Sequence, residues 1–117
     1  MSIPNYNQIV RTTGGVEVKR APISTEAPNG VCVAGVTGKR ICVLGICLIA
    51  SEVTTVVFTS NGTPLSGPIT LAARGGFVVN PPADPAMHWI ETSIGEHLML
   101  TNSEEQQVSG FIAYYEA

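Results

Sequence analysis

Apolar and polar positions alternate in short runs along most of the chain. From residue 30 onward these runs are interrupted by Gly, Pro, Asn and Ser at intervals of about 8–12 residues, which is typical of a β-sandwich or barrel. No segment keeps the period of an amphipathic helix for more than one or two turns. The pattern therefore predicts little helix, and strands over residues 16–23, 30–36, 39–50, 53–60, 68–73, 76–79, 88–92, 97–101 and 107–115.

Turn-forming residues separate several of these strands. Asn61-Gly62 follows a β-rich run, and this dipeptide readily supplies the positive φ angles of a tight turn. Residues 103–106 separate two further strands in the same way and predict another hairpin. Three prolines within residues 80–87 predict a loop, because proline lacks the donor that a sheet ladder needs.

The strand at residues 39–50 is apolar on both faces. A sandwich strand usually directs apolar side chains to the core and polar ones to water. Both faces are therefore expected to be covered, one by the opposing sheet and the other by another subunit or by an arm or loop of the same chain. Strict alternation also places Cys42 and Cys47 on opposite faces, where they cannot share a metal ion.

Residues 1–20 mix polar positions with isolated apolar ones and contain Gly14-Gly15. This range predicts an extended N-terminal arm that is ordered by contact with a neighbour; the alternative is a first strand with a frayed terminus. Residues 21–117 form the predicted domain. The fold class expected is all-β, an antiparallel β-sandwich with an extended arm.

The composition favours a subunit that is packed against other chains. Only 13% of the residues are charged and 44% are hydrophobic, whereas globular proteins average about 25% charged. Large bare apolar patches are rare on soluble monomers, so part of the surface is expected to be covered in an oligomer or a larger assembly.

Several partners are not expected. The net charge is -3, and no basic cluster exceeds the pairs Lys19-Arg20 and Lys39-Arg40, so the basic stripe of a nucleic-acid-binding protein is missing. The longest apolar run, residues 41–50, is shorter than the roughly 20 residues of a membrane-spanning helix. The N-terminus lacks the pattern of a signal peptide, so synthesis and retention in a cytoplasm are expected.

Catalytic, metal and cofactor sites are not expected either. Asp84 is the only aspartate, and no serine lies in a nucleophile-elbow context. All three cysteines lie in apolar runs, where burial raises the thiol pKa and lowers reactivity. His88 and His97 are nine residues apart and do not form the closely spaced pair of a barrel metal site.

The residues expected at a protein interface are apolar side chains of the arm, the single tryptophan, and the closing strand. Trp89 is interpreted as a core or interface anchor, with stacking on a sugar as the alternative. The closing strand is apolar on both faces. The predicted interface residues are Ile3, Tyr6, Ile9, Val10, Trp89, Phe111 and Tyr115.

About half of the chain resembles a known group of proteins. The motifs are Ser66-Gly67-Pro68-Ile69, then Trp89-Ile90-Glu91-Thr92 leading into Gly95-Glu96-His97-Leu98-Met99-Leu100, and finally Val108-Ser109-Gly110-Phe111-Ile112-Ala113-Tyr114. They resemble small β-sandwich proteins encoded among the structural genes of tailed bacteriophages. The resemblance implies a jelly-roll-like subunit, commonly trimeric, that decorates or cements a capsid or forms part of a fibre or other appendage.

The resulting hypothesis is a non-enzymatic virion protein without cofactors. It is a capsid decoration (cement) protein that binds the phage head as a homotrimer, with the major capsid protein as its partner, and is located on the capsid surface after synthesis in the host cytoplasm. The alternatives are a fibre or head-to-tail adaptor subunit, or a carbohydrate-binding β-sandwich module whose site is Trp89 and the loop at residues 80–87.

Overall fold

The computed structural model describes residues 8–13, 16–82 and 84–117. Their regular structure is two antiparallel sheets and one short 3₁₀ helix, η1 (Pro85–Met87). None of the described helical segments has the length and apolar character needed to span a membrane. The first sheet contains β1 (Gln8–Thr13), β2 (Val16–Thr25), β11 (Val108–Glu116), β4 (Ile41–Ala50) and β8 (Gly76–Val79) in that order, with β9 (Ile90–Glu91) also paired to β4.

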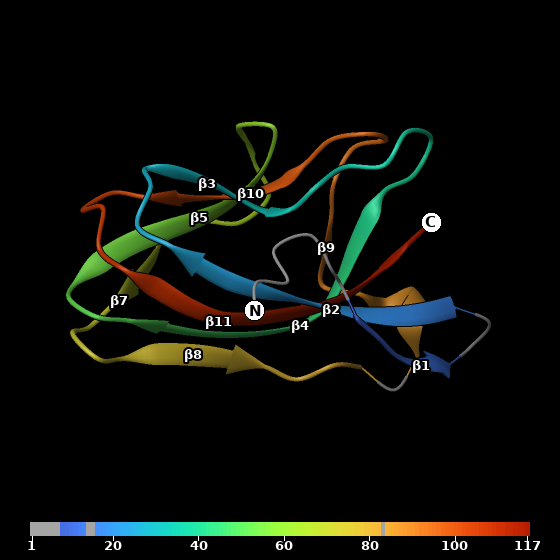
Figure 1. Cartoon of the computed structure of the whole chain (residues 1–117), viewed down its shortest axis with the longest axis horizontal. Helices are drawn as coiled ribbons and strands as arrows, with labels where there is room; N and C mark the ends of the chain where they lie inside the picture. The colour runs from blue at the N-terminus through green and yellow to red at the C-terminus, as the bar shows by residue number, and fades with distance from the viewer. Residues whose placement is uncertain (1–7, 14–15, 83) are drawn as a thin grey trace.

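The second sheet lies over the first as a separate layer (Figure 1). It contains β3 (Asn29–Val33), β10 (Leu98–Asn102), β5 (Thr54–Ser60) and β6 (Thr63–Pro64), with β7 (Ile69–Leu71) also paired to β5. The chain crosses repeatedly between the layers, so that β2-β11-β4-β8 forms one side and β3-β10-β5-β7 the other. This interleaving of early and late strands is the jelly-roll topology. The predicted all-β, jelly-roll-like sandwich is confirmed.

The predicted strands correspond closely to the observed ones, and β1 and β6 are the additions. The turn between β5 and β6 is confirmed: Asn61 and Gly62 have φ angles of 47° and 99°, and Ser60 pairs with Thr63 across them. In the range assigned to an arm, residues 8–13 form β1 and residues 16–20 form the first half of β2. For those residues the observed structure corresponds to the first-strand alternative.

The hairpin predicted at residues 103–106 is wrong, because the strands that this turn connects lie in different sheets. The buried Asn102 side chain holds the crossing. Its Oδ1 accepts a hydrogen bond from the Thr54 hydroxyl at 2.6 Å, and its Nδ2 donates to the Gln106 carbonyl at 2.6 Å. This cluster links β5 to the turn and directs the chain across the sandwich.

The core lies between the two sheets. Side chains from both inner faces meet there, and none of the described buried side-chain polar atoms lacks a hydrogen-bond partner. Burying this apolar surface is the main force that holds the layers together. The largest fully buried side chains are Tyr114, Phe58, Ile41, Leu44, Leu48, Leu98, Leu100 and Ile112. Leu44 belongs to a smaller cluster on the opposite side of the first sheet.

A β-bulge in β4 changes which of its side chains face the core. Ala113 pairs with Gly45 while the next residue, Tyr114, pairs with Val43, so Leu44 is the extra residue. The inter-sheet core consequently receives Ile41, Val43, Ile46, Leu48 and Ala50. The strict alternation predicted from the sequence is therefore wrong beyond Leu44. Cys42 and Cys47 both lie on the outer face of the first sheet.

Candidate functional site

The outer face of the first sheet has a covered half and an exposed half. In the covered half, Val18, Cys42, Leu44 and Tyr115 form a second buried cluster, with Ala113 packed against it. This cluster explains why β4 is apolar on both faces. The prediction that both faces of β4 are covered therefore holds for the first half of the strand.

The loop between β8 and β9 contributes to this cover. The backbone N–H of Trp89 donates to the carbonyl of Val43 at 2.8 Å. Pro81 lies against the small Gly45: a Cβ placed on this glycine would be 3.2 Å from Cγ of the proline. A loop of the same chain therefore covers part of β4, which is one of the two alternatives that the sequence left open.

A line of polar contacts fastens the loop to the sheet. The Tyr115 hydroxyl and His88 Nδ1 are 3.0 Å apart, and the two rings meet edge to face. His88 Nε2 lies 3.0 Å from Glu91 Oε1, and Glu91 Oε2 lies 3.3 Å from Arg40 Nε. These contacts join β11, the loop, β9 and the residue before β4. Their arrangement accounts for the position of the loop on the outer face.

Burial makes the proton-bearing groups beneath this loop less acidic. It raises the pKa of Tyr115 to about 12 and raises the pKa of the neighbouring Cys42 thiol. Tyr115 is only 7% exposed, so this predicted interface residue has little surface to offer a partner. Its position indicates a role in attaching the loop.

The exposed half of the outer face carries an apolar row that crosses four strands. Phe111 pairs with Pro22 on one side and with Cys47 on the other, and Cys47 pairs with Val78. Directly paired residues of antiparallel strands point to the same face. We call these four residues, Pro22, Phe111, Cys47 and Val78, the outer row. It contains no charged side chain.

The outer row is open to solvent among the described residues. Val78 is 67% exposed and Phe111 is 41% exposed, and Ile49, one pleat further along β4, is 54% exposed. The Arg20 guanidinium lies 5.1 Å from the centroid of the Phe111 ring, a cation–π contact at one side of the row. Of the predicted interface residues, Phe111 is the one that the structure places in this row.

The three free cysteines differ in their surroundings. Cys32 packs against the inter-sheet core, and burial raises its pKa to about 12. Cys42 is buried beneath the loop. Cys47 is partly exposed and lies in the middle of the outer row. The described cysteines thus include one thiol in the outer row that a reagent or an engineered partner can reach.

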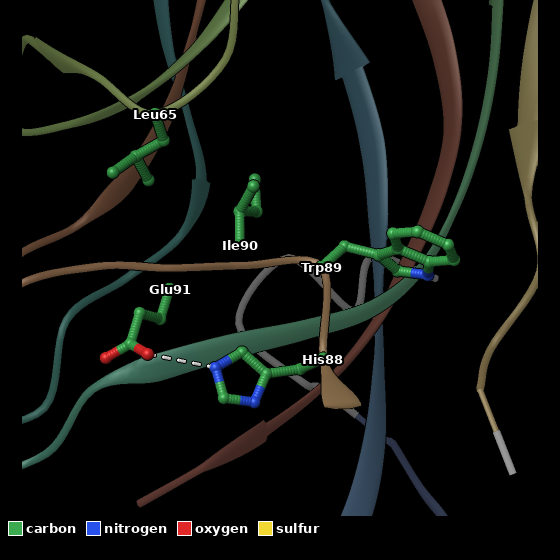
Figure 2. Close-up of a pocket in the computed structure, with 5 residues that line it drawn as sticks. All are labelled: Leu65, His88, Trp89, Ile90 and Glu91. Carbon is green, nitrogen blue, oxygen red and sulfur yellow. Dashed lines mark hydrogen bonds and ion pairs between the residues drawn. The ribbon is translucent and has the colours of Figure 1, made fainter. Parts of the chain in front are cut away.

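An open pocket lies beside the loop, apart from the outer row. An open pocket of about 320 Å³ is lined by Leu65, His88, Trp89, Ile90 and Glu91. Figure 2 shows the His88–Glu91 contact below the chain trace, with Leu65 and Ile90 above it and the indole of Trp89 turned to the other side. Trp89 is 56% exposed, and its Nε1 donates to the Asn80 carbonyl at 3.0 Å. Trp89 is therefore a surface residue, so the core half of its predicted role is wrong.

The remaining predicted residues are placed as follows. Ile3 and Tyr6 lie outside the described residues, and for Ile9 and Val10 the structure describes only the strand β1 to which they belong. No group of three or more His, Cys, Asp or Glu side chains within the described ranges is arranged to hold a metal ion. The outer row was not predicted as a unit, because it depends on the β4 bulge and on pairing between distant strands.

Comparisons with known proteins identify no family. No protein-family model matches the chain, and no curated protein matches it. Among solved structures, the chain is similar to one in the cryo-EM structure of a virus-like particle of the extra small virus of the giant freshwater prawn Macrobrachium rosenbergii. The two chains are 14% identical over 98% of this chain and 89% of the other, with a TM-score of 0.41. A similarity of this extent is too weak to carry a functional argument.

Proposed function

We propose that the chain is a non-enzymatic structural subunit of a virion and that it assembles through the outer row. The observation that supports this most is an uncharged apolar row that remains exposed on an otherwise well-packed sheet. Jelly rolls are recurrent in viral capsids, although they also occur in lectins and cupins. The fold is therefore compatible with the proposal, and the exposed row supplies the reason for assembly.

The proposed role within the virion is that of a capsid decoration protein. It forms a homotrimer on the capsid surface and contacts the major capsid protein; a fibre or head-to-tail adaptor subunit would use the same kind of sandwich. Stable interfaces bury about 1,200–2,000 Å², with a few apolar and aromatic residues at the centre contributing most of the affinity. Repetition over a symmetric shell then strengthens a modest contact at each site.

The proposed absence of catalysis is supported by the state of the reactive groups. Two thiols and the buried tyrosine have raised pKa values, so they carry little negative charge near neutral pH. His88 and Glu91 hold the loop in place through their mutual contact. A well-packed fold with few activated groups suits a subunit whose role is to pack against other chains.

The first prediction concerns self-association. The full chain is expected to scatter light as an oligomer at micromolar concentration, and Val78→Ser is expected to raise the dissociation constant of that oligomer about 10-fold or more, because an apolar contact at the centre of an interface is lost. Val31→Ser is the matched control, since Val31 is 55% exposed but lies on β3 of the other sheet.

Two results would contradict the proposal. One is that the unaltered chain remains a 12.3 kDa monomer over the whole micromolar range. The other is that the two valine variants behave alike. Membership in a virion has its own measurement: the chain is expected to sediment with purified particles in a fixed number of copies per particle, and loss of the chain from washed particles would count against a virion role.

A carbohydrate-binding module is the second candidate, and the open pocket beside the exposed Trp89 favours it. The indole offers a face on which a sugar ring can stack, and His88 and Glu91 line the pocket as hydrogen-bonding groups. Trp89 is the single tryptophan, so its fluorescence reports on this place alone. Under the preferred function, titration with mono- and oligosaccharides leaves the fluorescence unchanged; a saturable change that Glu91→Gln weakens would favour the second candidate.

A further inference from the structure

The outer row has the dimensions of a short peptide segment. It crosses from β2 to β8 through β11 and β4, which is three strand spacings. At about 4.8 Å per spacing this distance is roughly 14 Å. An extended chain covers about 3.3–3.6 Å per residue, so four or five residues span the row.

The segment of this chain that precedes β1 has a composition that suits such a contact. Residues 1–7 have no charged side chain, and they include the bulky apolar side chains of Ile3, Pro4 and Tyr6. The four residues of the row are also uncharged, so covering them removes no ionic group of the row from water; the Arg20 guanidinium lies beside the row, over the Phe111 ring. Pro4 has no backbone N–H, which suits a segment that lies across the face of a sheet and does not pair in its ladder.

The described part of β1 begins near the Pro22 end of the outer row of its own sheet. Gln8 pairs with Arg20, which is two residues from Pro22 along β2. β1 is antiparallel to β2 and runs along the edge of the sheet. A segment that continued the direction of β1 beyond Gln8 would run parallel to the strands. To cross the row of its own sheet, which runs across the strands, such a segment would have to turn through a right angle. The row of an adjacent copy can lie at another angle to the segment, so no such turn is needed.

We propose that residues 1–7 of a neighbouring copy of this chain cover the outer row, so that copies are linked by their N-terminal segments. This inference rests on the proposed function, because it names the partner that the outer row takes in the assembly. Tyr6 lies near Cys47 at the centre of the row and contacts Phe111. The contact is repeated from copy to copy, since each copy has one segment and one row.

Cys47 makes the proposal testable by disulfide formation. In the variant Tyr6→Cys, mild oxidation with oxidised glutathione is expected to link chains through residues 6 and 47, giving multiples of 12.3 kDa in electrophoresis without reductant. Adding Cys47→Ser is expected to remove these products, while Cys42→Ser is expected to leave them. Glu104→Cys, on an exposed turn, controls for random collision between thiols.

The outcomes separate this inference from the function on which it rests. If the Tyr6→Cys chain stays at 12.3 kDa and its mass shows an internal disulfide between residues 6 and 47, without attached glutathione and absent when Cys47→Ser is added, its own segment covers the row and the inference is overturned. If the linked products form no faster than with Glu104→Cys while light scattering still shows an oligomer, the inference fails and the proposed function stands. A chain that is monomeric at every concentration overturns both.

Discussion

Replacing Gly110 by alanine is expected to lower the free energy of unfolding by about 3 kcal/mol or more, which is enough to threaten the fold of a domain this small. Gly110 has a φ angle of 150° in the middle of β11, between β2 and β4. A Cβ at this position would lie 1.8 Å from the carbonyl oxygen of Cys47. This obstacle is the backbone of a central strand, so relief requires β4 and β11 to separate. Urea unfolding of the purified variant measures the loss.

Gly67 provides the matched control. A Cβ at Gly67 meets no atom within 4 Å, and its φ angle lies outside the left-handed range. Gly67→Ala is therefore expected to change the free energy of unfolding by less than about 1 kcal/mol, in either direction. Equal stability of the Gly110 and Gly67 variants would show that β11 and β4 are not packed as closely as the structure has them.

Phe58→Ala is expected to cost about 3–5 kcal/mol, because it leaves a cavity in the inter-sheet core. Phe58 is 1% exposed and lies on β5, opposite Leu100 of β10. Phe111→Ala removes the same atoms from the outer row, where the ring is 41% exposed. Its cost is expected to be about 1 kcal/mol, most of it the lost contact with Arg20. Thermal or urea unfolding at concentrations where the chain is dissociated measures both values.

The contrast between these two phenylalanines bears directly on function. Phe111 is expected to add little to the stability of the single chain. Its exposed ring is therefore interpreted as a surface on which another chain packs. Phe111→Ala is accordingly expected to weaken self-association more than it weakens folding. Should Phe111→Ala destabilise the dissociated chain as much as Phe58→Ala, the ring belongs to the fold, and the outer row loses its support as a contact surface.

The outer face of the first sheet is buried by the chain itself in one half and left exposed in the other. β4 carries apolar side chains on both sides of the sheet, and removing them from water stabilises whatever covers them. Near its start, the loop carrying Pro81 and His88 contributes the cover, and Tyr115 anchors that loop. Further along, Cys47 is left partly exposed and Ile49 exposed among the described residues. The boundary between the halves marks where the fold of the single chain ends and assembly is proposed to begin.

The strands and the tight turn were predictable from the sequence because their causes are local. Alternation of apolar and polar side chains reports which strands have one wet face, and Asn61-Gly62 favours positive φ angles whatever surrounds it. The prolines at 81 and 82 exclude a sheet ladder by their own chemistry. The class of fold follows from these local signals, since many short strands without helices leave a sandwich or a barrel as the solution.

The β4 bulge, the crossing after Asn102 and the outer row could not be predicted from the sequence, because the residues that determine them lie far apart in the chain. The bulge at Leu44 is set by the register of β4 against β11, about 70 residues later. The crossing after Asn102 depends on Thr54, 48 residues earlier, and the burial of Tyr115 depends on His88. Once the bulge shifts the alternation of β4, Cys47 points outward and joins Phe111 and Val78 in one row. The sequence alone determines that β4 is apolar on both faces; strand register decides which of its residues the fold buries and which are left exposed.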